Sequence, residues 1–404
     1  MPKPLTQARL RRMAIAASFR APTTLGRAVA ALGFVQADPI RAPARAQDLI
    51  LRHRVTDYRV GDLQRRFAPL RLEEDFLYAY GIMPRDTWHL LHPRYDPDGD
   101  NGRHAPTGLA ADVLAFVRDR AITHPRDLAE RFGRERALNG WGSWSAATTR
   151  ALQSLHYYGL LRVAHRQDGI RIYAPAPPHA EPLSRDERTR RVVLLVTRIL
   201  APLPERSLRA TCGLLSRGVP DLGDPADAVR SLLASGELES GDVEGERYLW
   251  PPGIRATEPP RAVRFLAPFD PLVWDRRRFA LLWDWDYRFE AYTPAADRRL
   301  GYYAMPLLWG ERVIGWANAT ATNGAVQVTP GFTDAAPKGR DFRQALDAEI
   351  ARLTTFLQPR CSPPLLVGLG READQGWGEG SLTSAGRQIY APLPQPPPTR
   401  GGGE

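Results

Sequence analysis

The sequence has almost no lysine and very little cysteine, and these absences limit the chemistry open to it. Only two of the 55 basic residues in the 404-residue chain are lysine, Lys3 and Lys338. Schiff-base catalysis needs a lysine amine, and neither lysine lies in a segment with the pattern of a pocket. The two cysteines, Cys212 and Cys361, lie far apart without a cysteine neighbour at metal-ligand spacing. This excludes a disulfide scaffold and a thiolate zinc site.

Nucleotide and metal signatures and long apolar runs are also missing. The chain has no glycine-rich loop that ends in Gly-Lys-Ser/Thr and no His-Glu-x-x-His motif, so we expect no metal and no cofactor. His89 and His92 lack a carboxylate or thiol beside them, and we interpret them as surface or packing residues. The most apolar run, Val192 to Leu200, contains Arg198 and is too short to span a bilayer. Without a secretory signal at the N-terminus, we expect a cytoplasmic protein with no membrane partner.

Arginine is what the sequence has in excess. The formal net charge is +10, which points to a polyanionic partner such as nucleic acid. Arginine forks onto phosphate and stacks on bases in a way that lysine does not. The alternative is a GC-rich coding sequence, which also produces chains rich in Arg, Ala and Pro. The hydrophobic share of 43% is that of a globular protein, and the length favours two to four packed units.

The segment from Gly108 to Ala174 predicts three helices followed by a hairpin. Apolar spacing, a proline near a helix start and a polar Gly-containing turn mark the elements. We expect helices over 109–117 and 124–132, a third helix capped by Ser145 and running to 157, and strands over 160–163 and 169–173. This is the order of a winged helix, in which the third helix usually reads the DNA groove.

The same order recurs on both sides of this segment. Downstream we expect helices over 185–200 and 208–215, a third beginning at Asp224-Pro225, and strands over 236–239 and 246–250. Upstream we expect helices over 5–18 and 25–32, the second capped by Thr23 or Thr24, and an extended segment over 34–38. Three loosely similar copies indicate tandem winged-helix (helix-turn-helix) domains.

Beyond Trp250 a Pro-rich linker precedes short alternating runs that favour an antiparallel sheet or small barrel. The runs cover 287–292, 300–308, 312–322 and 325–328, with a helix over 342–357 behind them. The expected fold class is therefore α+β, with tandem winged helices and a small C-terminal β domain. The expected domains are 1–104, 105–180 and 181–255 for the three winged helices, 256–388 for the β domain with its terminal helix, and 389–404 for a disordered tail.

The candidate catalytic residues are Gln36 and Asp38. In an extended segment the two side chains point to the same side, where a carboxamide and a carboxylate can hold and activate one water molecule. The alternative is structural, because an aspartate before Pro39 also has the pattern of a helix cap followed by proline. Local sequence alone leaves both interpretations open.

Longer stretches resemble the YcaQ/AlkZ family of bacterial winged-helix DNA glycosylases over roughly residues 5 to 360. The matching stretches are Leu32–Ile40, Ala44–Leu51 with Arg54 and Tyr58, Met83–Arg85, Leu266–Arg276, Asp286–Glu290, Tyr292–Pro294 and Gly301–Pro306. The resemblance implies a concave basic DNA-binding surface of three winged helices with a β domain beside it. It also places Gln36 and Asp38 in the glutamine–apolar–aspartate motif of the YcaQ branch.

From this resemblance we expect a DNA glycosylase that removes N7-alkylated, cationic purines and can unhook interstrand crosslinks. Because the chain has no suitable lysine, we expect it to be monofunctional. Its partner is damaged duplex DNA, and we expect a monomer. Arg41, Arg45 and Arg54 are expected to hold phosphates, and the candidate accessory residues are Tyr78, Asp270, Trp274 and Arg276. The sequence does not decide between base flipping into a pocket and an open cleft.

One stretch departs from the family pattern. Relatives in the YcaQ branch have a Trp-Ala-His-Glu-like stretch where this chain has Phe76-Leu77-Tyr78-Ala79, so Tyr78 replaces the histidine and Ala79 the glutamate. The alternatives are a changed substrate choice or a loss of activity. Two non-catalytic functions also stay open: a winged-helix transcriptional regulator, and a nucleic-acid-binding scaffold.

Overall fold

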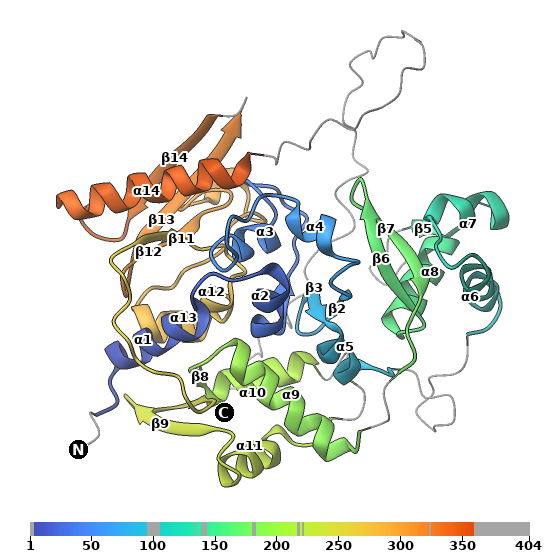
Figure 1. Ribbon diagram of the computed structural model, residues 1–404, viewed down its shortest axis with the longest axis horizontal. Coiled ribbons are helices and arrows are strands. Elements are labelled where there is room, and N and C mark those ends of the chain that lie inside the picture. Colours follow the sequence, from blue (N-terminus) through green and yellow to red (C-terminus); the bar gives the residue numbers. More distant parts are fainter. Residues whose placement is uncertain are drawn as a thin grey trace, which may run out of the picture. The chain divides into compact units, whose positions relative to one another are not determined.

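The computed structural model describes residues 4–94, 106–133, 135–138, 144–179, 183–215, 219, 222–322 and 325–358 (Figure 1). The expected tail over 389–404 and the end of the expected β domain, beyond 358, lie outside the described residues. None of the described helices is long and apolar enough to cross a membrane.

Three units of the chain share one order of elements: helix, strand, helix, helix, strand, strand. The first unit contains α2 (Leu25–Leu32), β1 (Val35–Gln36), α3 (Ala46–Leu51), α4 (Asp62–Arg66), β2 (Leu72–Phe76) and β3 (Tyr80–Pro84). The third contains α9 (Arg185–Ile199), β8 (Leu203–Pro204), α10 (Glu205–Leu215), α11 (Pro225–Ala234), β9 (Glu239–Val243) and β10 (Glu246–Trp250). Both sheets are antiparallel with the last strand in the middle, in the orders β1-β3-β2 and β8-β10-β9.

The second unit follows the same path with an extra hairpin. It contains α6 (Leu109–Arg120), α7 (Pro125–Phe132), β4 (Arg136–Leu138), β5 (Trp144–Ala146), α8 (Ala147–Tyr157), β6 (Leu161–Gln167) and β7 (Ile170–Pro175). A single bridge from Thr123 to Tyr173 takes the place of the first strand. The three units therefore repeat one topology.

Most of the predicted helices are confirmed, and their caps explain where they begin. Thr24 accepts a hydrogen bond at the start of α2, and Asp224 accepts one at the start of α11. Two local predictions are wrong. The cap of α8 is Ala146 and not Ser145, which lies in β5. The strand expected over 236–239 begins only at Glu239, because Gly236 has a φ of 73° and lies in a turn.

The C-terminal part is a four-stranded antiparallel sheet covered by one long helix. Its strands, in order, are β11 (Val263–Phe265), β12 (Met305–Trp309), β13 (Arg312–Thr322) and β14 (Ala325–Phe332). The helix α14 (Arg340–Leu357) packs against β11 and β14 (Figure 1). The strand expected over 287–292 is not formed. That segment is irregular and lies between the helices α12 (Pro271–Trp274) and α13 (Arg276–Trp283) and the short helix η1 (Ala295–Asp297).

The hydrophobic cores do not follow the expected domain boundaries. One core joins apolar residues of the first unit, such as Val35 and Ile50, to Phe265 and Phe356 of the C-terminal part. Another joins Phe34 and the helix α5 (Arg85–Leu91) to α9. A third packs the first helix, α1 (Gln7–Ser18), on α12 and α13. Among the described residues only the second unit has a core of its own, formed between Val113 and Tyr173.

Candidate active site

A glycine on the neighbouring strand allows the backbone to approach closely at Gln36. β1 pairs with β3, and Gln36 lies opposite Gly81. A Cβ atom on Gly81 would lie 2.5 Å from the ring of Phe34 and from the carbonyl oxygen of Val35, closer than real side chains allow. The pairing that carries the candidate motif therefore depends on the absence of a side chain at this position.

The Asp38 carboxylate is buried, and a short turn holds one of its oxygens. The residue is 9% exposed, its Oδ1 accepts from the backbone N–H of Ile40 (2.9 Å), and its own backbone N–H donates to Oε1 of Gln47 (3.3 Å). No helix begins at Pro39, so the helix-cap interpretation is wrong. Oδ1 closes a local Asx turn, and Oδ2 accepts no hydrogen bond from the described residues.

Burial raises the pKa of Asp38 to about 6, and the hydrogen bond from Ile40 offsets only part of that effect. In the described part of the chain no arginine or lysine forms an ion pair with this carboxylate. Asp38 is therefore mostly ionised at neutral pH, and its pKa lies close to the pH of the solution. General-base catalysis is most effective in that range.

Two further polar atoms near Asp38 are buried without a hydrogen-bond partner: Oε1 of Gln36 and the hydroxyl of Tyr303. Gln36 is the last residue of β1 and lies two positions before Asp38 in the chain. Burial and then the charge of Asp38 raise the pKa of Tyr303. The phenol therefore lies within the electric field of that carboxylate. Leaving a buried polar group unpaired costs about 1–3 kcal/mol, so two such atoms beside one unpaired carboxylate mark a site for a polar ligand.

A small pocket with a volume of about 50 Å³ lies next to the motif. Its lining includes Ala37, Arg45, Gln47, Asp48, Glu74 and Arg166. Arg45, expected to hold a phosphate, lines this pocket, and its guanidinium lies 3.3 Å from where a Cβ of Gly169 would be. Gly169 lies in the turn between β6 and β7, so Arg45 contacts the second unit.

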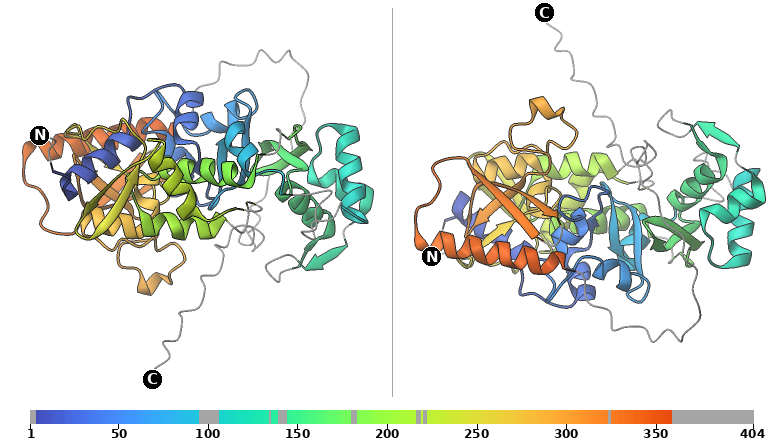
Figure 2. Two further views of the ribbon diagram at one scale, coloured as in Figure 1. Left: turned by 90° about the horizontal axis from the view of Figure 1, so that it is seen from below. Right: turned by 90° about the horizontal axis from the view of Figure 1, so that it is seen from above.

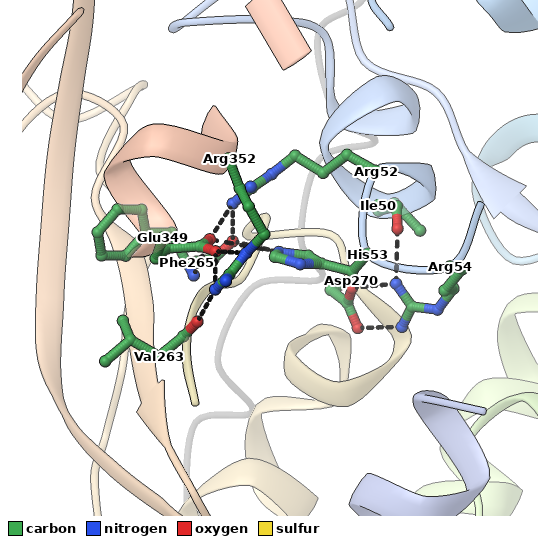
Figure 3. Close-up of polar contacts among 9 residues, drawn as sticks. All are labelled: Ile50, Arg52, His53, Arg54, Val263, Phe265, Asp270, Glu349 and Arg352. Atoms are coloured by element: carbon green, nitrogen blue, oxygen red, sulfur yellow. Dashed lines mark hydrogen bonds and ion pairs between the residues drawn. The ribbon is translucent and has the colours of Figure 1, made fainter. Parts of the chain in front are cut away.

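Arg54, also expected to hold a phosphate, is an interior residue. It is 5% exposed and forms a two-pronged ion pair with the Asp270 carboxylate at 2.8 and 2.9 Å (Figure 3). The same guanidinium donates to Ser18 and to the carbonyl of Ile50. With these donors engaged inside the protein, Arg54 does not fit a phosphate contact, and we remove it from the DNA-binding set. Arg41 is exposed three residues after Asp38.

The chain after the motif is bound tightly to the C-terminal part. Arg52 donates to the buried carboxylate of Glu349 in α14 (2.5 Å) and to the carbonyl of Phe265 (3.1 Å) (Figure 3). His53 contacts the same carbonyl at 3.0 Å. Together with the pair between Arg54 and Asp270, these contacts hold the end of α3 against the C-terminal part.

Three of the four candidate accessory residues lie close together. The Tyr78 ring lies 4.1 Å from that of Trp274 and 4.9 Å from that of Phe34. Burial and then the charge of Asp270 raise the pKa of Tyr78. Arg276 is exposed at the start of α13. Within the described residues no hydrogen bond or ring contact joins this group to Gln36 or Asp38.

Four residues that contact Asp38 or act on its surroundings were given no role by the sequence: Gln47, Tyr292, Tyr302 and Tyr303. Gln47 holds the Asp38 backbone, and Tyr303 and Tyr292 respond to the Asp38 charge. Tyr302 in turn acts on both tyrosines. All four lie in stretches that carry the family resemblance, and that was the available signal.

The comparisons with known proteins agree with this fold. The family model described as DNA glycosylase AlkZ-like matches residues 29–356, which is most of the chain and includes the Gln36–Asp38 motif. The chain therefore belongs to the AlkZ-like DNA glycosylase family, a class of DNA repair enzymes.

A solved structure shares this architecture. The Streptomyces sahachiroi DNA glycosylase AlkZ is similar to this chain with a TM-score of 0.55 at 15% sequence identity. The similarity covers 88% of this chain and 97% of the AlkZ chain. At this identity the likeness shows a common fold.

Proposed function

We propose that this glycosylase hydrolyses the N-glycosidic bond of a cationic, N7-alkylated purine in duplex DNA and can unhook crosslinks formed at that atom. The positive charge on the base makes it a good leaving group without a strong general acid. The remaining task is to stabilise an oxocarbenium-like sugar and to direct water to its anomeric carbon. The observation that carries this proposal is a buried carboxylate without a cationic partner, next to an unpartnered carboxamide oxygen.

In the proposed reaction Gln36 and Asp38 act on one water molecule. Gln36 Oε1 accepts one of its hydrogens and orients it, and Asp38 takes the other as general base. The water oxygen bonds to the anomeric carbon as the bond to the purine nitrogen breaks, and the electron pair of that bond neutralises the departing base. The ionised Asp38 also opposes the positive charge that develops on the sugar.

We further propose that the three repeated units are winged helices that lie along the DNA. Their common topology and the excess of arginine support this assignment. In such folds the third helix reads the groove, and here that helix is α4, α8 or α11. Arg41 is a phosphate contact beside the reacting nucleotide. A chain with three such units has less need to dimerise, and we expect a monomer.

We also propose that the enzyme is monofunctional. An enzyme that cleaves the sugar–phosphate chain through a Schiff base needs an amine at the anomeric carbon. Lys338 is exposed between β14 and α14, and Lys3 lies outside the described residues. The product is then an abasic site, and borohydride traps no covalent adduct.

The experiment is base release from a duplex that contains one 7-methylguanine. We expect release by the wild-type chain and a loss of about 10²–10⁴-fold in rate for Asp38→Asn, the usual contribution of a general base. Asparagine retains an oxygen for the turn to Ile40, so DNA binding and folding are preserved. Sequence-selective DNA binding without base release would instead indicate a transcriptional regulator. Equal, salt-sensitive affinity for intact and alkylated DNA would indicate a scaffold.

A further inference from the structure

We propose that Tyr292 and Tyr302 form a stacking surface for one nucleobase at the active site, which we call the tyrosine ledge. Their exposed fractions are 54% and 45%, unusually high for large aromatic side chains. The loop that carries them, around η1, projects from the rest of the described chain in both views of Figure 2. This inference rests on the proposed function, because it assigns the ledge to the reacting nucleotide or its neighbour.

The loop of Tyr292 and the segment of the candidate catalytic carboxylate share one hydrophobic core although more than 250 residues separate Asp38 from Tyr292 in sequence. The Phe289 ring, 6.1 Å from that of Tyr292, packs against the same core as Ala37 and Ile40, which flank Asp38. Partial burial and then the Asp38 charge raise the pKa of Tyr292 to about 12, and Tyr302 acts on Tyr292 in the same way. The contacts of Arg52 and Arg54 hold the C-terminal part against the segment that follows the motif (Figure 3). A base held on the ledge would therefore lie near the groups that act on its sugar.

The loop is built to hold the ledge in one place. The carboxylate of Glu290 accepts three consecutive backbone N–H groups, from Arg299 (3.1 Å), Leu300 (2.8 Å) and Gly301 (3.2 Å). The Phe289 ring lies 6.1 Å from that of Tyr292 and 5.1 Å from that of Tyr303. A loop fixed at both ends loses little conformational freedom when a base stacks on it, and this favours binding.

The chemistry of the ledge suits a cationic base. The Arg298 guanidinium lies 5.0 Å from the centre of the Tyr302 ring and donates to the carbonyl of Thr293 (2.8 Å), which orients that ring. Base stacking on an aromatic side chain tolerates any sequence because every base has a π-face. A purine with a positive charge from N7 alkylation gains further from the electron-rich face of the Tyr292 ring, whereas Arg298 already covers one face of the Tyr302 ring. The ledge therefore favours alkylated purines over unmodified ones.

The first test compares leucine and phenylalanine at each position. We expect Tyr292→Leu and Tyr302→Leu each to lower the single-turnover rate of 7-methylguanine release about tenfold, the usual effect of losing one stacking partner. Tyr292→Phe and Tyr302→Phe keep the ring and should stay within about twofold of wild type. Both side chains are exposed, so the melting temperature should not change. Wild-type rates in both leucine variants would overturn the proposal.

A second measurement does not depend on base release. A duplex with one unpaired adenine presents a base that can leave the helix, and the ledge should hold it. We expect each leucine variant to bind this duplex about tenfold more weakly than wild type and to bind a fully paired duplex equally well. If the wild-type chain releases no base, the proposed function fails while this measurement still tests the ledge. Unchanged affinity for the bulged duplex would overturn it.

A different observation carries a second inference, about Tyr303. We infer that its hydroxyl, which has no partner although the residue is only 3% exposed, donates to the attacking water. That water would then donate to Gln36 and Asp38 and accept from Tyr303, which leaves one lone pair for the anomeric carbon. This inference also rests on the proposed function.

Tyr287 provides a matched control for Tyr303. Both are buried, but the Tyr287 hydroxyl donates to the carbonyl of Ala304 (2.7 Å). We expect Tyr303→Phe to keep the wild-type KM and to lower kcat about tenfold, with a melting temperature equal to or above that of wild type because no hydrogen bond within the protein is lost. Tyr287→Phe should lower the melting temperature and keep kcat. A wild-type kcat in Tyr303→Phe would overturn the inference. A loss of stability equal to that of Tyr287→Phe would also overturn it, because it would show that the Tyr303 hydroxyl forms a structural hydrogen bond. The stability measurement can be made even if the chain is inactive.

Discussion

Buried carboxylates lie at opposite edges of one small sheet, three at one edge and one at the other, and their surroundings differ. On β2, Glu73, Glu74 and Asp75 are each at most 5% exposed, and each forms an ion pair: with Arg162 (2.8 Å), Arg166 (2.6 Å) and Arg94 (2.7 Å), respectively. The opposite edge of the sheet is β1, and β3 lies between β1 and β2. Asp38 follows two residues after the end of β1. That carboxylate is also buried but has no cationic partner among the described residues.

The consequence is visible in the pKa values. Burial opposes the ionisation of Glu74 and Asp75. The charges of Arg166 beside Glu74 and Arg94 beside Asp75, together with hydrogen bonds, outweigh this effect, so the pKa of each carboxyl falls below its ordinary range. For Asp38 burial acts almost alone and the pKa rises to about 6. Two of the paired carboxylates, Glu73 and Glu74, join the first unit to the second through Arg162 and Arg166. The unpaired one is left able to accept a proton, at the expense of stability.

Removing a paired carboxylate should have the largest effect on stability. Asp75→Asn removes the carboxylate that pairs with the guanidinium of Arg94, which is 1% exposed. We expect a loss of about 3–5 kcal/mol in the free energy of unfolding, measured with denaturant. The control is Asp286→Asn, which removes a carboxylate from an exposed ion pair and should change stability by less than about 0.5 kcal/mol. Equal effects of the two variants would show that β2 is not held by its ion pairs.

Breaking the pair between Arg54 and Asp270 should destabilise the fold by about 3 kcal/mol and leave DNA affinity per folded molecule unchanged. We expect Arg54→Met to lower the melting temperature without changing the salt dependence of DNA binding. The double variant Arg54→Met/Asp270→Asn removes both charges and should recover part of the stability. A shallower salt dependence in Arg54→Met would contradict the interior assignment and restore Arg54 as a phosphate contact.

Removing the unpaired carboxylate should stabilise the protein at neutral pH. The folded-state pKa of Asp38, about 6, exceeds the ordinary value of 3.8, so the folded protein binds this proton more tightly than the unfolded chain. The ionised group thus destabilises the fold above pH 6, and this penalty disappears as the pH falls through 6 toward 4. We expect Asp38→Asn to be more stable than wild type by about 2 kcal/mol at pH 8 and equal at pH 4.

The difference between Asp38→Asn and wild type cancels all other titrating groups, so it can be read directly from paired unfolding curves. Asp341→Asn, in an exposed ion pair with Arg261, serves as the control and should show no such pH dependence. A variant that is less stable than wild type at pH 8 would mean that the Asp38 charge has a partner in the fold.

The smallest effect is expected at Arg41, an exposed charge next to the motif. Arg41→Ala should leave stability within about 0.5 kcal/mol of wild type and weaken DNA binding a few-fold. The slope of log affinity against log salt should fall by about 0.9, the value for one phosphate contact. An unchanged slope would exclude a phosphate contact at Arg41.

The same comparison explains what the sequence could and could not predict about the fold. Helices α6, α7 and α9 were predicted because their apolar residues recur at helical spacing. The strands β2 and β3 were missed. In β2 the buried residues after Leu72 are Glu73, Glu74 and Asp75, so the strand has no apolar alternation. Its carboxylates are buried in ion pairs instead, Glu73 and Glu74 with arginines of the second unit and Asp75 with Arg94. Sequence periodicity reports burial in an apolar core and not burial in an ion-pair network.

The site was predictable to a similar degree. Sequence alternation predicts that Gln36 and Asp38 point to one side of an extended segment. The observed β1 includes Gln36 but ends before Asp38, so this stays a prediction. The sequence pattern could not distinguish an exposed arginine from a buried one, and Arg54 was therefore expected to hold a DNA phosphate. Nor could it bring Tyr292, Tyr302 and Tyr303 to Asp38, because that proximity depends on how the C-terminal part packs against α3.

The most direct test of a catalytic, unpaired Asp38 is the pH dependence of 7-methylguanine release under single-turnover conditions between pH 4.5 and 8, with spontaneous base loss subtracted at each pH. We expect the rate to rise with pH through a midpoint near 6 and to level off above 7, and this midpoint to be absent from the residual rate of Asp38→Asn. A midpoint near 4, or the same profile in both proteins, would contradict the assignment of Asp38 as the general base.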